Sequence, residues 1–231
     1  MIRDILKRAI WRYRMLYNSV LFRFKSMTGR VFRLIYRPPF PHVDGNAVYL
    51  HLGCGYVNHP KFINIDVIPL RHIHYVRNID NLSIFKDYSV DLIYASHCLE
   101  HFPFSAVPII LKEWHRVLKP KGILRLSVPD FDLLLKVYNE TGHNIQNIIR
   151  YLMGGQDSKY NYHYSIFNFK SLEAELYAIG FAEVRRWDPT TTDIRMDDWA
   201  SRQVEINVMR FPISLNVEAI KYPCLRLRNT I

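Results

Sequence analysis

The chain has 231 residues, of which 49% are hydrophobic, 14% aromatic and 23% charged. This much apolar surface excludes disorder over most of the chain and is enough to bury one good core. The formal net charge is +10, which raises the question of a nucleic-acid partner. Residues 1–37 alone carry a net charge of +9, so the rest of the chain is nearly neutral. A nucleic-acid partner is therefore not expected.

The three cysteines are widely spaced and form no Cys-x-x-Cys pair. A disulfide framework and a structural zinc site are both unexpected, and a reducing compartment fits. No uncharged stretch is long enough to span a bilayer as a helix. Arginines interrupt the apolar residues at the N-terminus throughout, unlike a secretory signal. These features predict a cytoplasmic protein.

The N-terminal segment has the pattern of a basic amphipathic helix. Apolar residues recur at helical spacing from Ile2 to Phe24, and the basic residues lie mostly on other faces. This pattern predicts a helix that ends near Gly29. Residues 37–41, with the sequence Arg-Pro-Pro-Phe-Pro, predict a stiff extended connector.

We therefore divide the chain into a basic arm with its connector, residues 1–41, and one folded domain, residues 42–231. An amphipathic basic helix can lie on an anionic membrane surface, pack on its own domain or a partner, or serve as an organellar transit peptide. Trp11 and several tyrosines beside arginines favour peripheral membrane contact through residues 1–37, at the inner face of the membrane.

From Gly45 onward, short strands alternate with helices. The expected strands cover residues 47–52, 62–67, 73–76, 90–95, 123–128, 182–187 and 213–220, and the expected helices cover 108–118, 131–140, 143–153 and 169–179. The alternation predicts an α/β fold with a Rossmann-like, seven-stranded, mainly parallel sheet and helices on both of its faces. The N-terminal amphipathic helical arm precedes this domain.

Glycines and acids stand where the first three strands end, and ligands of open α/β sheets bind at these carboxyl ends. Gly53 and Gly55 allow a tight turn and a close approach to a ligand after the first strand. Asp66 follows the second strand and suits ribose hydroxyls, whereas Asp80 follows the third and suits an adenine amino group. The competing interpretation is that these are only turn residues and helix caps. The ordered set predicts an adenosine cofactor.

The spacing of this set selects among adenosine cofactors. A dinucleotide fingerprint needs a third glycine where Asn58 stands, and an acid about 20 residues beyond the glycines. Asp66 follows Gly53 by only 13 residues, which leaves too little room for a full helix. A P-loop is excluded because no Gly-Lys-Ser/Thr is present. S-adenosylmethionine (SAM) has no phosphate and tolerates a short connection.

Several segments resemble class I SAM-dependent methyltransferases of the type 11 group. They are YLHLGCG at 49–55, INID at 63–66, SVDLIYASHCLEHF at 89–102, LKEWHRVLKPKG at 111–122 and LSVPD at 126–130, with shorter matches at 154–156, 162–163, 180–181 and 213–219. The resemblance spans residues 46–221. The pattern is similar to that of predicted methyltransferases associated with bacterial surface-polysaccharide synthesis.

This resemblance implies SAM as the cofactor and a set of residues that hold it. Gly53 and Gly55 would line its methionine end, while Ser96 and His97 would form the floor of the site. Asp66 would hold the ribose and Asp80 the adenine amino group; His51 stands where the family often has an acid. The predicted cofactor-binding residues are His51, Gly53, Cys54, Gly55, Asp66, Asp80, Ser96 and His97.

The expected reaction is methyl transfer to a hydroxyl of a small-molecule or lipid-linked glycan acceptor, such as a precursor of a surface polysaccharide. Such a hydroxyl benefits from a base of near-neutral pKa, for which His101 and His163 are the candidates, with Glu100 as an orienting group. The competing interpretation is that His101 caps a helix and that His163 packs beside Tyr162.

Residues 97–101, His-Cys-Leu-Glu-His, also satisfy the H-x-x-E-H pattern of a zinc hydrolase, with His97 and His101 as ligands and Glu100 as base. That chemistry needs both histidines on one helix, whereas these residues directly follow a strand and precede Pro103. No metal site is therefore predicted. The other alternative is a non-catalytic SAM-binding protein.

Overall fold

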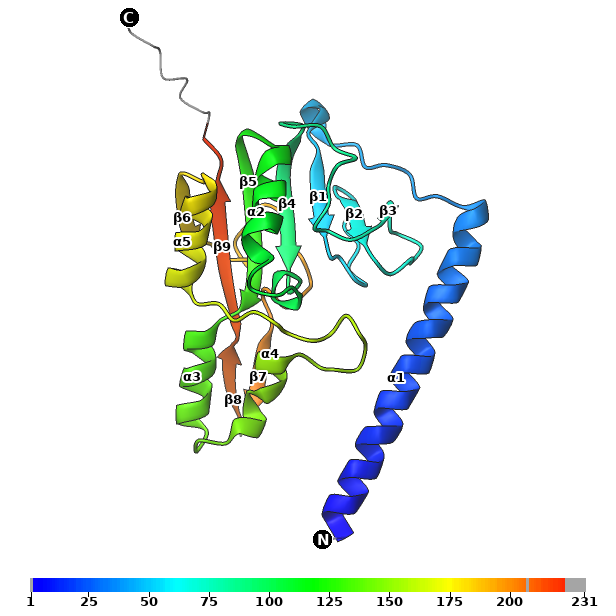
Figure 1. The fold of residues 1–231 in the computed structure, drawn as a ribbon, viewed down its shortest axis with the longest axis vertical. Coiled ribbons are helices and arrows are strands. Elements are labelled where there is room, and N and C mark those ends of the chain that lie inside the picture. Colours follow the sequence, from blue (N-terminus) through cyan, green and yellow to red (C-terminus); the bar gives the residue numbers. More distant parts are fainter. Residues whose placement is uncertain (1, 207, 223–231) are drawn as a thin grey trace, which may run out of the picture.

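The computed structural model describes residues 2–206 and 208–222 (Figure 1). Seven strands form one sheet in the order β3-β2-β1-β4-β5-β9-β6. They are β1 (Tyr49–Leu52), β2 (Ile63–Asp66), β3 (Tyr75–Val76), β4 (Val90–Ser96), β5 (Leu118–Pro129), β6 (Glu183–Arg186) and β9 (Ser214–Ile220). Only β9 runs antiparallel to its neighbours β5 and β6. The predicted seven-stranded, mainly parallel sheet is confirmed.

The strand order reverses between β1 and β4, which lie side by side in parallel. In open α/β sheets a crevice forms at such a point, outside the carboxyl ends of the strands. The helices of the described residues are α1 (Ile2–Ile35), α2 (Val107–Val117), α3 (Phe131–Glu140), α4 (Ile149–Met153) and α5 (Phe169–Ile179). Short 3-10 turns cover Asp44–Asn46, Leu99–His101 and Ile145–Asn147.

Two of these helices form where the sequence provides caps. Asp130 precedes α3 and accepts a hydrogen bond from the amide of Asp132. Asn168 and Ser171 form a reciprocal capping box at the start of α5, and Gly180 ends that helix in the left-handed conformation with φ 114°. Both helices have the predicted bounds, because their start and stop signals are local.

Side chains of β4 alternate between two cores. Ile93 and Ala95 belong to the main core with Trp114 of α2 and Leu176 of α5, and these two helices contact each other. Tyr94 and its neighbours on the opposite face pack against Ile194, Met196 and Trp187, which come from the segment after β6. The expected second layer of helices is thus replaced by a loop on that face. The short β1–β2 connection has no room for a crossover helix.

A small hairpin was not expected from the sequence. It consists of β7 (Gln203–Ile206) and β8 (Met209–Pro212), and its Val204 and Phe211 pack with Leu134 and Val137 of α3. The strands are too short for a clear period-2 pattern. The helix expected over 143–153 is a 3-10 turn followed by the short α4.

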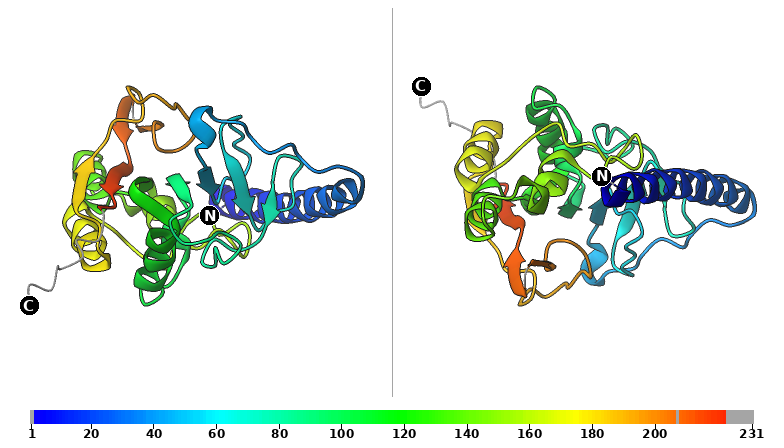
Figure 2. Two further views of the ribbon diagram at one scale, coloured as in Figure 1. Left: turned by 90° about the horizontal axis from the view of Figure 1, so that it is seen from above. Right: turned by 90° about the horizontal axis from the view of Figure 1, so that it is seen from below.

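The arm helix α1 lies beyond the β3 edge of the sheet, at the opposite side of the domain from α5 (Figures 1 and 2). It continues through Gly29, where its end was expected, to Ile35. Arg33 donates hydrogen bonds to the carbonyls of Ile73 and His74, and the Arg71 guanidinium lies 4.4 Å from the ring centre of Phe32. These contacts offset the cost of about 1 kcal/mol that a glycine brings to a helix interior.

None of the helices in the described part of the chain combines the length and the apolar character that crossing a bilayer requires.

Candidate functional site

The turn after β1 is tied to the end of β2. Gly53 and Gly55 both have positive φ, 62° and 52°, which glycine adopts readily. The amide of Gly53 donates to the carbonyl of Ile65, and the amide of Gly55 donates to Oδ2 of Asp66 at 2.8 Å. A Cβ on Gly53 would lie 2.6 Å from the Cβ of Cys98. The sequence motif therefore forms a rigid turn at the crevice.

A cavity of about 260 Å³, here called the strand-end cavity, opens beside this turn. Asp66 lies in its wall and is almost fully buried. Burial raises the pKa of Asp66, and the backbone amides of Ile68 and Gly55 oppose that shift. Ile79 and Phe102 supply apolar wall. A buried carboxylate between apolar walls fits the ribose and the base of an adenosine.

The structure separates Asp80 from this cavity. Asp80 is exposed and accepts a hydrogen bond from the side-chain amide of Asn78 at 2.9 Å. Asn78 and Ile79 line the strand-end cavity, whereas Asp80 does not. Sequence reasoning selected the acid because of its charge, although the residue two positions earlier is the one at the cavity.

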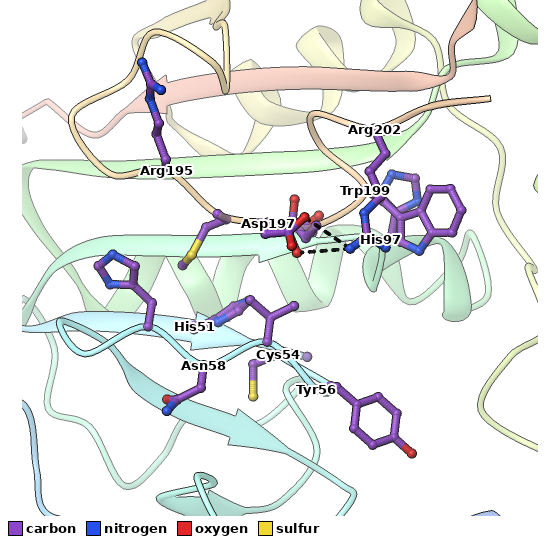
Figure 3. A pocket seen from close by; sticks show the side chains of 16 residues that line it. His51, Cys54, Tyr56, Asn58, His97, Arg195, Asp197, Trp199 and Arg202 are labelled. Atoms are coloured by element: carbon purple, nitrogen blue, oxygen red, sulfur yellow. Dashed lines mark hydrogen bonds and ion pairs between the residues drawn. The ribbon is translucent and has the colours of Figure 1, made fainter. Parts of the chain in front are cut away.

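A second cavity of about 600 Å³, here called the loop cavity, lies between the glycine turn and residues 195–202 (Figure 3). His51, Cys54 and Ser96 line it, as do Gly53, Gly55 and His97. Burial lowers the pKa of His51 to about 3, so the imidazole is neutral at physiological pH. Burial also raises the pKa of the Cys54 thiol, which therefore stays protonated.

The charged groups of the loop cavity come from a segment to which the sequence analysis assigned no role. Arg195, Asp197, Asp198 and Arg202 all line this cavity, and Arg202 donates to Asp197 Oδ1 at 3.2 Å (Figure 3). Tyr94 of β4 donates to Asp198 Oδ2 at 2.7 Å and so ties the segment to the sheet. No sequence motif marks these residues.

A third cavity of about 350 Å³, here called the histidine cavity, also borders His97. Its lining residues are His97, Glu100, His101, Pro129, Arg150, Tyr151, Gly155, Asn161, His163, Trp199 and Ile213. His97 has φ 51° and borders all three cavities. His101 borders both the strand-end and the histidine cavity.

The fold brings both predicted base candidates to a buried acid. The ring centres of His101 and His163 are 4.9 Å apart, and Glu100 has no exposed surface. Burial would raise the pKa of Glu100, but the neighbouring His97, with His101 and His163, holds it below its usual value. Because its pKa is lowered, the Glu100 carboxyl is ionised at neutral pH. Burial lowers the pKa of His163 as well.

The same geometry contradicts the zinc-hydrolase alternative. Residues Leu99–His101 form one 3-10 turn after the strand, and His97 is in the left-handed conformation outside it. The single helix that the H-x-x-E-H arrangement requires is thus not present at these residues. That alternative is not favoured.

Comparisons with known proteins identify a family for part of the chain and solved structures of the same fold. Residues 64–126 match the family described as a methyltransferase domain. A SAM-dependent methyltransferase from Archaeoglobus fulgidus shares 15% identity at a TM-score of 0.51, over 90% of this chain and 100% of that one. The 1,6-didemethyltoxoflavin-N1-methyltransferase of Burkholderia thailandensis shares 16% identity at a TM-score of 0.47, over 96% of this chain and 82% of that one. No curated protein sequence is significantly similar to this chain.

The sheet order, with its antiparallel β9, and the matched segment define a class I SAM-dependent methyltransferase fold. The chain is accordingly a methyltransferase enzyme whose cofactor is S-adenosylmethionine.

Proposed function

We propose that this methyltransferase transfers the methyl group of SAM to a hydroxyl of a small polar acceptor, such as a saccharide precursor of a surface polysaccharide. The observation that carries the proposal is the shared wall of two cavities: His97 and His101 border both the strand-end and the histidine cavity. A cofactor in the first and an acceptor in the second would meet at these two residues.

In this proposal Asp66 accepts hydrogen bonds from the ribose hydroxyls. Its two oxygens already accept from the amides of Gly55 and Ile68, and each keeps a further lone pair. Asn78 and Ile79 take the role at the adenine that sequence reasoning gave to Asp80. The amino-acid part of SAM lies along the glycine turn and enters the loop cavity.

The loop cavity also offers a partner for each charge of that amino-acid part. His51 is neutral and cannot replace the acid that the family often has at its position. Asp197 and Asp198 supply carboxylates for the ammonium group, and Arg195 or Arg202 supplies a cation for the carboxylate. This assignment explains why the head of the glycine motif can be a histidine.

Methyl transfer is an in-line displacement, so alignment of the acceptor supplies much of the catalysis. The acceptor oxygen attacks the methyl carbon, the carbon–sulfur bond breaks, and its electron pair stays on sulfur. The hydroxyl proton needs an acceptor. His101 and His163 each direct Nδ1 at a backbone carbonyl, so the Nε2 lone pair of either ring is free to accept that proton.

The lining of the histidine cavity favours a saccharide among small acceptors. Tyr151 and Trp199 provide aromatic surface for the apolar face of a sugar ring. Arg150 and Asn161 provide donors for its hydroxyls. A lipid-linked glycan would expose such a sugar at the membrane surface.

Peripheral membrane contact through the arm is part of the same proposal. Among the side chains of α1 that the structure describes, several large apolar ones are exposed, including Tyr17, Phe24, Val31 and Leu34. Residues 1–37 also carry most of the net positive charge of the chain. Apolar and basic groups on one long helix suit an anionic surface.

The acceptor is tested with SAM labelled in its methyl group and pools of nucleotide sugars and lipid-linked glycans. We expect labelled methyl ethers with the wild type and at least about tenfold less with His101→Ala and with His163→Ala. Label on nitrogen or carbon atoms, distinguished from an O-methyl group by the ¹³C chemical shift of the transferred methyl, would contradict the hydroxyl assignment.

A further inference from the structure

Four side chains converge between the strand-end and histidine cavities: His97, Glu100, His101 and His163. Glu100 has no exposed surface, and neither of its carboxylate oxygens accepts a hydrogen bond from any group in the described part of the chain. Buried oxygens without partners are unfavourable. Three imidazoles surround these oxygens, and imidazole and carboxylate groups together are the donor types of a transition-metal site.

The histidines present ring nitrogens suited to hold a cation. Nδ1 of His101 lies 3.0 Å from the Tyr162 carbonyl, and Nδ1 of His163 lies 2.9 Å from the Tyr151 carbonyl. Each ring thus donates its Nδ1–H to backbone and keeps a lone pair on Nε2. Nε2 of His163 is 3.9 Å from Glu100 Oε1. One ligand atom from each of these two rings and one Glu100 oxygen all lie within 4.8 Å of one another.

His97 adds a third imidazole to Glu100. Ser214 donates its hydroxyl proton to the Trp199 carbonyl at 2.7 Å, so it accepts from Nε2–H of His97 at 2.8 Å. Nδ1 of His97, the nitrogen that Ser214 does not contact, lies 3.3 Å from Glu100 Oε1. His97 therefore lies beside the carboxylate of the cluster.

We propose that Glu100, His101 and His163 bind a divalent transition-metal ion such as Zn²⁺, with His97 beside Glu100. Imidazole and carboxylate ligands suit Zn²⁺ and its neighbours better than Mg²⁺, which prefers oxygen alone. A histidine ligand commonly donates its other ring N–H to a backbone carbonyl, as His101 and His163 both do. Three protein ligands leave one coordination position of the ion free, and this position faces the histidine cavity.

The role of the ion rests on the proposed function, whereas its binding does not. In the open position, the ion contacts the acceptor hydroxyl and lowers its pKa. The proton is released to solvent, the oxygen attacks the methyl carbon, and the carbon–sulfur bond breaks with its electron pair on sulfur. With the ion bound, His101 and His163 are ligands and not proton acceptors.

Metal binding is tested on the full chain without a histidine tag, after treatment with a chelator and dialysis. Zn²⁺ affinity is measured by competition with a chromophoric chelator, and Co²⁺ absorption reports the ligand geometry. We expect one equivalent in the wild type and in the control His42→Ala, whose histidine is exposed on the connector. His163→Ala and Glu100→Gln are expected to bind more than about tenfold more weakly.

A positioning variant gives an independent readout. Ser214→Ala removes the partner of His97 Nε2, together with the hydrogen bond to the Trp199 carbonyl, and is expected to shift the Co²⁺ spectrum with a smaller loss of affinity. Absence of stoichiometric Zn²⁺ in the wild type, or equal affinity in the wild type and in folded His163→Ala, would overturn the metal site. Circular dichroism checks that each variant is folded.

Calorimetry with S-adenosylhomocysteine separates this inference from the proposed function. His163 lines only the histidine cavity among the three, so His163→Ala is expected to bind the cofactor product as the wild type does. Normal binding of the cofactor product without a metal site would overturn the inference alone. Metal binding by a protein that methylates no hydroxyl would instead overturn the acceptor assignment.

Discussion

The carboxylate of Asp66 accepts a hydrogen bond from the backbone amide of Gly55 at 2.8 Å, so the residue that closes β2 also holds the turn that closes β1. Its other oxygen accepts from the amide of Ile68. Both contacts orient the carboxylate before any ligand arrives. The proposed ribose contact would therefore be preorganised, which lowers the cost of binding.

Asp66→Ala should weaken SAM binding by about 10- to 100-fold. Hydrogen bonds to a charged group contribute about 1.5–3 kcal/mol, and 1.4 kcal/mol corresponds to a factor of ten. Calorimetry with SAM and S-adenosylhomocysteine measures the loss. Asp80→Ala is the matched control, because Asp80 is exposed and outside the strand-end cavity. A larger loss in Asp80→Ala than in Asp66→Ala would restore the role first predicted for Asp80.

His51 should make the protein less stable in acid. Its pKa is about 3 in the folded chain and near 6.5 in the unfolded chain, so the unfolded state binds the extra proton between these values. The free energy of unfolding therefore falls as the pH drops from 7 toward 3. Between pH 7 and pH 4.5 the contribution of this residue is about 3 kcal/mol at most.

His51→Leu tests this dependence, since Nδ1 of His51 has no hydrogen-bond partner in the described structure to lose. Urea unfolding at pH 7 and pH 4.5 should show a smaller loss of stability in His51→Leu than in the wild type. His42→Leu, at an exposed position, should keep the wild-type slope. Equal slopes in all three proteins would mean that His51 does not titrate as proposed.

Asp198→Ala should destabilise the fold by about 1–3 kcal/mol, because it leaves the buried hydroxyl of Tyr94 without its acceptor. The neighbouring Asp197 has a side chain that is 94% exposed, and Asp197→Ala should change stability by less than about 0.5 kcal/mol. Urea denaturation measures the free energy of unfolding of Asp198→Ala and of Asp197→Ala. If both variants unfold at the same urea concentration, the hydrogen bond between Tyr94 and Asp198 does not anchor residues 195–202 to the sheet.

Charge reversal on the arm should reduce membrane binding. Each basic side chain near an anionic surface contributes about 1 kcal/mol, so Arg23→Glu with Arg30→Glu should weaken vesicle binding by more than about tenfold. Flotation with phosphatidylserine vesicles measures the bound fraction. Lys112→Glu with Lys170→Glu, at exposed positions of the domain, is the control. Equal flotation of both pairs of variants would contradict membrane binding through residues 1–37.

The signals that predicted the fold correctly are local ones. The caps at Asp130 and Asn168 set where α3 and α5 begin, and Gly180 sets where α5 ends. The β7–β8 hairpin was missed because its short strands are held by packing on α3, which lies far away in sequence. The arm helix passes Gly29 for the same kind of reason, since its stabilising contacts come from residues 71–74.

In the candidate site too, local signals predicted some residues, whereas tertiary packing decided others. Glycines 53 and 55 and Asp66 mark the proposed cofactor site because strand ends, turns and their polar residues are adjacent in the chain. Sequence alone could not tell that Asn78 rather than Asp80 lines the strand-end cavity, because side-chain direction in a loop depends on what the loop packs against. It also gave no sign of residues 195–202, which Tyr94 and Asp198 hold to the sheet.

By itself, the sequence determined the alternation of strands and helices, the glycine turn and the separation of a basic arm from a nearly neutral domain. Each of these follows from periodicity, from backbone freedom or from charge, which neighbouring residues decide. Only the tertiary structure decided that Glu100 meets His163 across more than sixty residues of chain. That contact depends on how two loops pack, because burial brings distant side chains together and removes the water that would otherwise separate their charges.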